Sequence, residues 1–173
     1  MKDIVTASNS FEVKQLRIPK NRRFTIDSNA AMMDAPIYRY PFQQFAEATL
    51  AMNSSGMAMR FIDVCSAPEA NKAYWLTEVQ LMDARKQLQT ARQHFYTSVI
   101  QSWQEHVQQP SINCNVIKAV TIASRALAAT ARKLVDELYP YCGLTAANPS
   151  TEINRVWRNL HTASQHALLL PGT

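Results

Sequence analysis

The chain has 173 residues, enough for one domain with a hydrophobic core. Hydrophobic residues make up 47% of it and only 3 residues are glycine, which favours a helical domain over a β-sandwich with its many turn glycines. The net charge is +5, but the basic residues are dispersed, and the densest run, Lys20 to Arg23, is too small to indicate a nucleic-acid surface. We therefore expect no nucleic-acid partner.

The remaining composition points to a cytoplasmic protein that works in an assembly. Charged residues make up only 18%, below the usual quarter, which favours an oligomer or a larger complex. Cys65, Cys114 and Cys142 have no paired spacing, so they indicate neither a disulfide framework nor a zinc site. No signal-peptide pattern is visible and no apolar run is long enough to span a bilayer, so we expect no membrane partner.

The first part of the chain differs from the rest. Residues 10–19, SFEVKQLRIP, alternate apolar and polar side chains with a possible slip at Gln15, which predicts a strand ending at Pro19. A lone strand is not stable by itself, so this one must pair with a sheet in this chain or another. Pro36 and Pro41 then bracket a short extended link.

From Phe42 onward the period of the apolar residues is helical. The first predicted helix ends before Pro68, and the second runs from about Ala73 to Gln108. The third follows Pro110 with Ser111 as its cap and Gly143 as the C′ residue, and the fourth begins with Asn148 as N-cap and Pro149 at N1. Short connections predict an all-α fold, an antiparallel four-helix up-and-down bundle with a short N-terminal extended segment.

Each predicted helix carries one apolar stripe. The stripes are Phe42, Phe45, Thr49, Met52, Gly56, Met59 and Ile62; Leu81, Ala84, Leu88, Ala91, Phe95, Val99 and Trp103; Val116, Val120, Ala123, Leu127, Leu134 and Leu138; and Ile153, Val156, Leu160 and Ala167. Gly56 lies in mid-helix, where glycine costs about 1 kcal/mol relative to alanine. Two explanations for this glycine are open: another helix or a cofactor approaches closely there, or the position reflects plain helix packing.

The fourth helix also carries a polar stripe, formed by Arg155, Asn159, Thr162 and His166, with Arg158 beside it. Arginines near a helix start can hold phosphate, and a histidine can move protons near neutral pH. The plainer interpretation is an amphipathic helix facing water. Neither a phosphate-binding glycine loop nor the Glu-x-x-His pairs of a di-metal bundle occur in the sequence, so we expect no metal site.

Residues 154–169, NRVWRNLHTASQHALL, resemble the last helix of acyl-CoA dehydrogenase-like proteins, most closely the branch of flavin-dependent two-component monooxygenases. Arg155, Arg158 and His166 match the pattern of that branch, whereas Asn159 stands where the family usually has Asp. Residues 134–150 and 36–61 are similar to the bend before that helix and to the first bundle helix, and residues 6–24 to the final strand of the family's middle β-domain.

The resemblance implies a division into residues 1–35, a remnant of the β-domain, and residues 36–173, the C-terminal four-helix bundle. It implies FAD or FMN as cofactor and a homo-oligomer, a dimer or tetramer. His166 would be catalytic, as a base or hydrogen-bond donor, and Arg155 and Arg158 would bind flavin phosphate, contact a neighbouring subunit or tie the helix down. No carboxylate lies near His166 in the sequence, so proton abstraction from an acyl thioester is not expected.

Three hypotheses follow. The chain is one piece of a flavin-dependent oxidoreductase whose N-terminal and β-domains come from a separate polypeptide; or a non-catalytic bundle for oligomerisation or interaction; or a binder of flavin or an acyl-type ligand without turnover. The unpaired strand favours the first and the missing domains favour the second, and in each case the chain alone is expected to be inactive.

Overall fold

The computed structural model describes residues 12–67, 75–109 and 112–170. Its main helices are α1 (Phe42–Cys65), α2 (Glu78–Gln108), α3 (Cys114–Leu138) and α5 (Glu152–Ala163), with a one-turn α4 (Gly143–Ala147) between the last two. Short 3-10 turns are formed by Lys20–Arg22, Ser28–Ala30, Pro36–Arg39, Tyr139–Cys142 and Ala167–Leu169. The predicted all-α bundle is confirmed.

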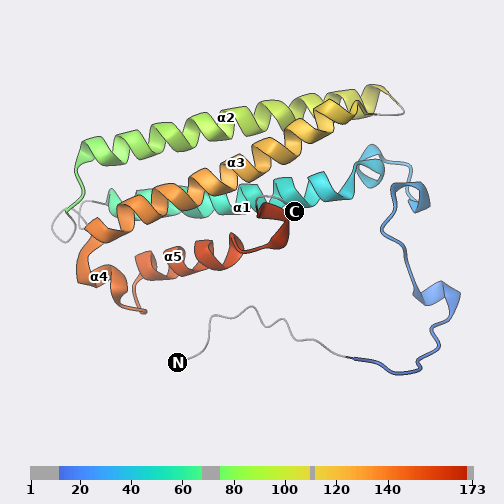
Figure 1. Cartoon of the computed structure of the whole chain (residues 1–173), viewed down its shortest axis with the longest axis horizontal. Helices are drawn as coiled ribbons and strands as arrows, with labels where there is room; N and C mark the ends of the chain where they lie inside the picture. Colours follow the sequence, from blue (N-terminus) through green and yellow to red (C-terminus); the bar gives the residue numbers. More distant parts are fainter. Residues whose placement is uncertain (1–11, 68–74, 110–111, 171–173) are drawn as a thin grey trace.

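The helices alternate in direction along the chain (Figure 1). From top to bottom of that view the helices are α2, α3, α1 and α5. The closest packing is between α1 and α3, while α2 packs against α3 and α5 packs against α1. The core therefore lies along the contact between α1 and α3. Phe61, Leu127 and Leu160 are completely buried there.

Local sequence signals explain where the helices begin and end. Thr77 and Gln80 form a capping box at the start of α2, so this helix begins later than its predicted start. Asn113 caps α3, while Ser111 lies outside the described residues. The predicted role of Gly143 at the end of the third helix is wrong: α3 ends at Leu138, and Gly143, with a φ of 64° and a ψ of -171°, follows the 3-10 turn Tyr139–Cys142.

The predicted start of the last helix is wrong. Asn148 ends α4 and accepts a hydrogen bond from the Ser150 backbone N–H, so it forms a turn before α5 instead of capping it. Thr151 is the N-cap, because its hydroxyl accepts from the Asn154 backbone N–H. The helix therefore begins at Glu152.

The predicted apolar stripes are confirmed on α2 except at Trp103, on α3, and for most of α5, but the α1 stripe is wrong at most positions and holds at Ile62. α1 buries small residues, Ala51, Ser54, Ser55 and Ala58, beside Phe61 and Ile62. These small side chains allow α3 to pack closely. The larger predicted positions, Phe42, Phe45 and Met59, are 58%, 48% and 42% exposed.

Gly56 lies on the outer side of α1. A methyl group built there would meet nothing within 4 Å. Packing within the described chain therefore does not require glycine at this position, and close approach of a cofactor to Gly56 stays a prediction.

The segment before α1 contains no strand in residues 12–41. The predicted strand is not formed in residues 12–19, since the described part of the chain holds no neighbouring strand to pair with its backbone. Gln15, the position of the predicted slip, has a φ of 56°. The link from Pro36 is a 3-10 turn and not extended.

This N-terminal segment leaves most of its apolar side chains exposed. Leu16 is 63%, Phe24 87% and Met32 100% exposed. Its last turn is attached to α2, since the Tyr40 hydroxyl hydrogen-bonds Ser102 Oγ at 2.7 Å and His106 Nε2 lies 2.8 Å from the Pro36 carbonyl oxygen. Burial raises the pKa of the Tyr40 phenol.

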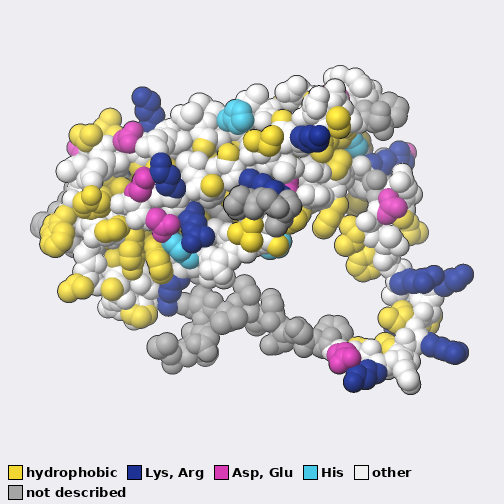
Figure 2. Space-filling view, viewed as in Figure 1, with side chains coloured by type: hydrophobic (Ala, Val, Ile, Leu, Met, Phe, Trp, Pro, Cys, Tyr) yellow, Lys and Arg dark blue, Asp and Glu magenta, His cyan; other side chains and the backbone are white. Residues whose placement is uncertain are grey.

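The charge distribution agrees with the sequence. Figure 2 shows Lys and Arg side chains scattered over the face in view instead of gathered in one patch. Among the described residues, no helix has both the length and the hydropathy that crossing a bilayer requires.

Candidate functional site

The candidate site is built on α5, which packs its apolar side onto α1. Ile153 and Leu160 are fully buried, and Val156 is nearly so. Asn154 is buried as well, and its side-chain amide donates to the Ala146 carbonyl oxygen at 2.7 Å. These contacts fix the rotation of α5, so that Arg155, Asn159 and Thr162 face outward.

Arg155 lies in the first turn of α5 and Arg158 just past the middle of the helix, and their surroundings differ. The Arg155 side chain is 63% exposed, and its guanidinium is 3.6 Å from Glu152. Glu152 is paired more tightly with Arg60 of α1, through two hydrogen bonds of 2.9 Å. Arg155 is therefore only weakly held and can turn toward another anion.

Arg158 is half-buried. Its Nη2 donates to the Pro149 carbonyl oxygen at 3.3 Å, which ties α5 to the turn before it. Its Nε is buried and has no hydrogen-bond partner among the described residues. An unpaired guanidinium donor is unfavourable unless something outside these residues accepts from it.

His166 does not lie on α5, contrary to the sequence prediction. The helix ends at Ala163 and turns through Ser164 and Gln165, so the polar stripe stops at Thr162. His166 instead precedes the last 3-10 turn, where its Nδ1 accepts from the Leu168 backbone N–H at 3.3 Å. This bond leaves the proton on Nε2. In this state the exposed ring can donate a hydrogen bond outward.

The structure does not bring the three predicted residues into one pocket. Arg155 and Ala163 are separated by about 12 Å along the helix axis, and His166 lies beyond that end. One cavity, of about 270 Å³, lies away from them between α1 and α2 and is lined by residues including Met59, Arg85 and Arg92. The candidate residues are therefore features of the outer surface of α5 and of the segment after it.

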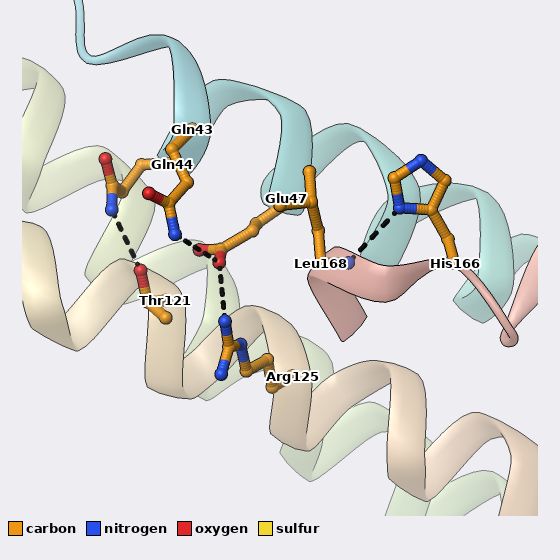
Figure 3. A network of polar contacts seen from close by, with 7 residues as sticks. All are labelled: Gln43, Gln44, Glu47, Thr121, Arg125, His166 and Leu168. Atoms are coloured by element: carbon orange, nitrogen blue, oxygen red, sulfur yellow. Dashed lines mark hydrogen bonds and ion pairs between the residues drawn. The ribbon is translucent and has the colours of Figure 1, made fainter. Parts of the chain in front are cut away.

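Two polar arrangements, the first buried and the second partly exposed, could not be found from the sequence. Figure 3 shows the first, in which Glu47 of α1 points toward Arg125 of α3, below the segment that carries His166 and Leu168. Glu47 Oε1 accepts from Arg125 at 3.1 Å and from Gln43 at 3.2 Å. Glu47 is completely buried, and its Oε2 has no hydrogen-bond partner among the described residues.

The second arrangement joins α5 to α3. His161 Nε2 is 2.7 Å from Asp136 Oδ1, and its Nδ1 is 2.8 Å from the Trp157 carbonyl oxygen. The Trp157 ring lies between those of Tyr139 and His161, with centroid separations of 4.8 Å and 4.1 Å. Only the four-residue spacing of Trp157 and His161 was visible in the sequence.

Comparison with known proteins decides the family. Residues 45–171 match the model of the acyl-CoA dehydrogenase C-terminal domain. The chain belongs to this family. It has the family's C-terminal helical domain, as the resemblance in residues 36–61 and 134–169 predicted.

Among curated proteins, the chain is 25% identical over 149 residues to indole-3-acetate monooxygenase of Pseudomonas putida, a match that covers 79% of this chain and 38% of that protein. The chain thus spans well under half the length of this curated relative.

Two solved structures share the fold. The HsaA monooxygenase from M.tuberculosis matches with a TM-score of 0.79 and 18% identity, over 92% of this chain and 46% of that one. The 3-HSA hydroxylase from Rhodococcus sp. RHA1 matches with a TM-score of 0.70 and 20% identity, over 79% of this chain and 36% of that one. The match to the HsaA monooxygenase covers 92% of the chain, which is more than residues 45–171 alone represent. The structural likeness therefore extends into the N-terminal segment.

Proposed function

We propose that this chain is the C-terminal part of a flavin-dependent monooxygenase of the acyl-CoA dehydrogenase type, active only when the remaining domains are supplied. The observation that carries the proposal is the family match over residues 45–171, together with relatives and neighbours described as monooxygenases or hydroxylases. These proteins are more than twice as long as the matched part, so the matched bundle is a minor share of each.

The surface of the bundle supports the need for further domains. Phe42, Phe45 and Met59 of α1 are exposed, and Gly56 between them has open space above it. Large exposed apolar patches usually mark contact surfaces. We infer that α1 and the N-terminal segment contact a homo-oligomer partner, in a dimer or tetramer, or a separate chain that supplies N-terminal and β-domains.

The polar groups on α5 fit a flavin in part. The unpartnered Nε of Arg158 and the weakly held guanidinium of Arg155 are suited to a phosphate of FAD or FMN. The ribityl chain of a flavin separates its ring from its phosphate, which agrees with two arginines within α5 and His166 beyond the end of this helix. Reduced flavin, when bound, would supply the electrons for dioxygen chemistry.

In this proposal His166 donates a hydrogen bond from Nε2 to the flavin ring or the substrate, because its Nδ1 is engaged by the Leu168 backbone N–H. The hydrogen bond from the Leu168 backbone N–H therefore favours His166 as a hydrogen-bond donor over His166 as a base. The complete enzyme would be cytoplasmic.

The test uses the chain in the complex that it forms in its native host. Arg155→Ala combined with Arg158→Ala should weaken flavin binding at least tenfold, measured by flavin fluorescence. Lys86→Ala combined with Lys133→Ala removes the same charge from α2 and α3 and should leave the affinity unchanged. Equal effects of the two double variants would reduce the arginines to a structural role.

His166 is tested separately by turnover. His166→Ala should lower kcat at least a hundredfold while flavin affinity and thermal stability stay the same. His94→Ala, which removes an exposed histidine from α2, is the matched control. Unchanged turnover in His166→Ala would show that His166 has no catalytic role.

A further inference from the structure

Two cysteines separated by 77 residues meet in the core. Cys65 is the last residue of α1, and Cys142 is the last residue of the 3-10 turn that follows α3. Their sulfur atoms are 3.7 Å apart, and the side chains are 1% and 0% exposed. The third cysteine, Cys114, is exposed at the start of α3.

We propose that Cys65 and Cys142 form a modification site, at which a hydroperoxide converts the two thiols into a disulfide joining the end of α1 to the turn before α4. The two sulfur atoms must approach by about 1.7 Å to reach bonding distance. Both residues are at the ends of their elements, where the backbone yields more easily than inside a helix. Gly143, with its φ of 64°, directly follows Cys142 and adds freedom at that end.

The thiols are not equivalent. Cys142 donates to the Leu138 carbonyl oxygen at 3.5 Å, while the hydrogen bond from Cys65 lowers the pKa of Cys142. The same bond, together with burial, raises the pKa of Cys65. Cys142 is therefore the thiol that ionises and attacks, and Cys65 is the one that resolves.

The reaction balances in two steps. The Cys142 thiolate attacks one oxygen of the hydroperoxide, the O–O bond breaks, and the products are a sulfenic acid and an alkoxide or hydroxide that takes up a proton. The Cys65 sulfur then attacks the sulfenic sulfur, the S–S bond forms and water leaves. The thiols together lose two electrons and two protons, and the hydroperoxide is reduced to an alcohol, or to water if it is hydrogen peroxide.

Oxidation would act on the part of the fold that supports α5. The connection from Cys142 leads through α4 to Thr151, and its Ala146 carbonyl oxygen accepts from Asn154 of α5. A disulfide would hold this connection on the end of α1. Because the bond closes a loop of 77 residues, it restricts the unfolded chain strongly and should raise Tm by about 10 °C.

The experiment treats the reduced full chain, carrying Cys114→Ala, with hydrogen peroxide and then alkylates it under denaturing conditions. The expected result is a monomer whose mass has fallen by two hydrogen atoms, with no alkylated cysteine, a peptide linking Cys65 to Cys142, and a raised Tm that dithiothreitol reverses. Cys65→Ala in the same background should instead show no internal link and no rise in Tm.

Three results would overturn the proposal. In the first, both Cys65 and Cys142 can still be alkylated at a peroxide concentration that fully oxidises Cys114 in the chain without the Cys114→Ala change. In the second, Cys142 gains oxygen but forms no link to Cys65, and in the third, disulfide-bonded dimers form in place of the internal bond. Any of them would show that Cys65 and Cys142 do not form a disulfide with each other. None depends on flavin binding or turnover.

Discussion

The buried pair between Glu47 and Arg125 should respond very differently to the loss of one partner or the other. Glu47 is 0% exposed, whereas the Arg125 side chain retains 21% of its surface. Arg125→Met leaves a carboxylate inside the protein with only Gln43 as a donor, and Glu47→Gln leaves a cation that still reaches water. The first change should therefore cost about 3 kcal/mol of unfolding free energy and the second about 1 kcal/mol.

These values are measured by urea denaturation at pH 7, followed by far-ultraviolet circular dichroism. For a chain of this size they correspond to a lower Tm by about 6–12 °C for Arg125→Met and about 3 °C for Glu47→Gln. Arg132→Met removes an exposed arginine that pairs with Asp136 at 3.7 Å, and it should change stability by less than about 0.5 kcal/mol.

The double variant Glu47→Leu with Arg125→Met tests the cause. Removing both charges should recover most of the stability lost in Arg125→Met, because the penalty comes from the uncompensated buried carboxylate. If Glu47→Gln costs as much as Arg125→Met, or if the double variant is no more stable than Arg125→Met, the reasoning is refuted.

Three further predictions concern the frame of the bundle. Thr77→Ala removes the capping box shared with Gln80 and should lower the free energy of unfolding by about 1 kcal/mol, whereas Thr97→Ala within α2 should cost less in the same urea titration. Phe61→Ala should cost about 3–5 kcal/mol by leaving a cavity in the core, and a loss below about 1 kcal/mol would contradict the packing described. In the unfolded chain the Tyr40 phenol loses its proton above about pH 10, whereas burial raises its pKa in the folded protein. Because the unfolded state then binds fewer protons than the folded state, the free energy of unfolding should fall as the pH rises above about 10. Tyr40→Phe should lose about 1 kcal/mol at pH 8 and show a smaller fall above pH 10; an unchanged pH profile would show that Tyr40 does not contribute to it.

The sequence predicted the bundle well where an apolar stripe is also the buried side, as on α2 and α3. It failed on α1, because this helix buries Ala51, Ser54, Ser55 and Ala58, whose small side chains give a weak periodic signal. The larger residues Phe42, Phe45 and Met59 dominate the pattern but lie on the surface. Periodicity identifies an apolar face and cannot tell whether this chain or another molecule covers it.

The candidate site was located only in part. The outward direction of Arg155 follows from the helical period, but the end of α5 at Ala163 does not, since no glycine or proline marks it in residues 164–169. His166 was therefore placed on a helix that ends before it. Contacts distant in sequence, Glu47 with Arg125 and Cys65 with Cys142, could not be predicted from spacing because only the fold brings them together.

In the proposed function, this bundle works as part of a larger flavoprotein. The most direct test is to isolate the tagged chain from its native host, identify each copurifying polypeptide by mass spectrometry and record the visible spectrum of the complex. If the bundle is part of a flavoprotein, the complex contains the N-terminal and β-domains and shows the absorption of a bound flavin. A colourless oligomer of this chain alone would contradict it and would identify the chain as a non-catalytic helical bundle.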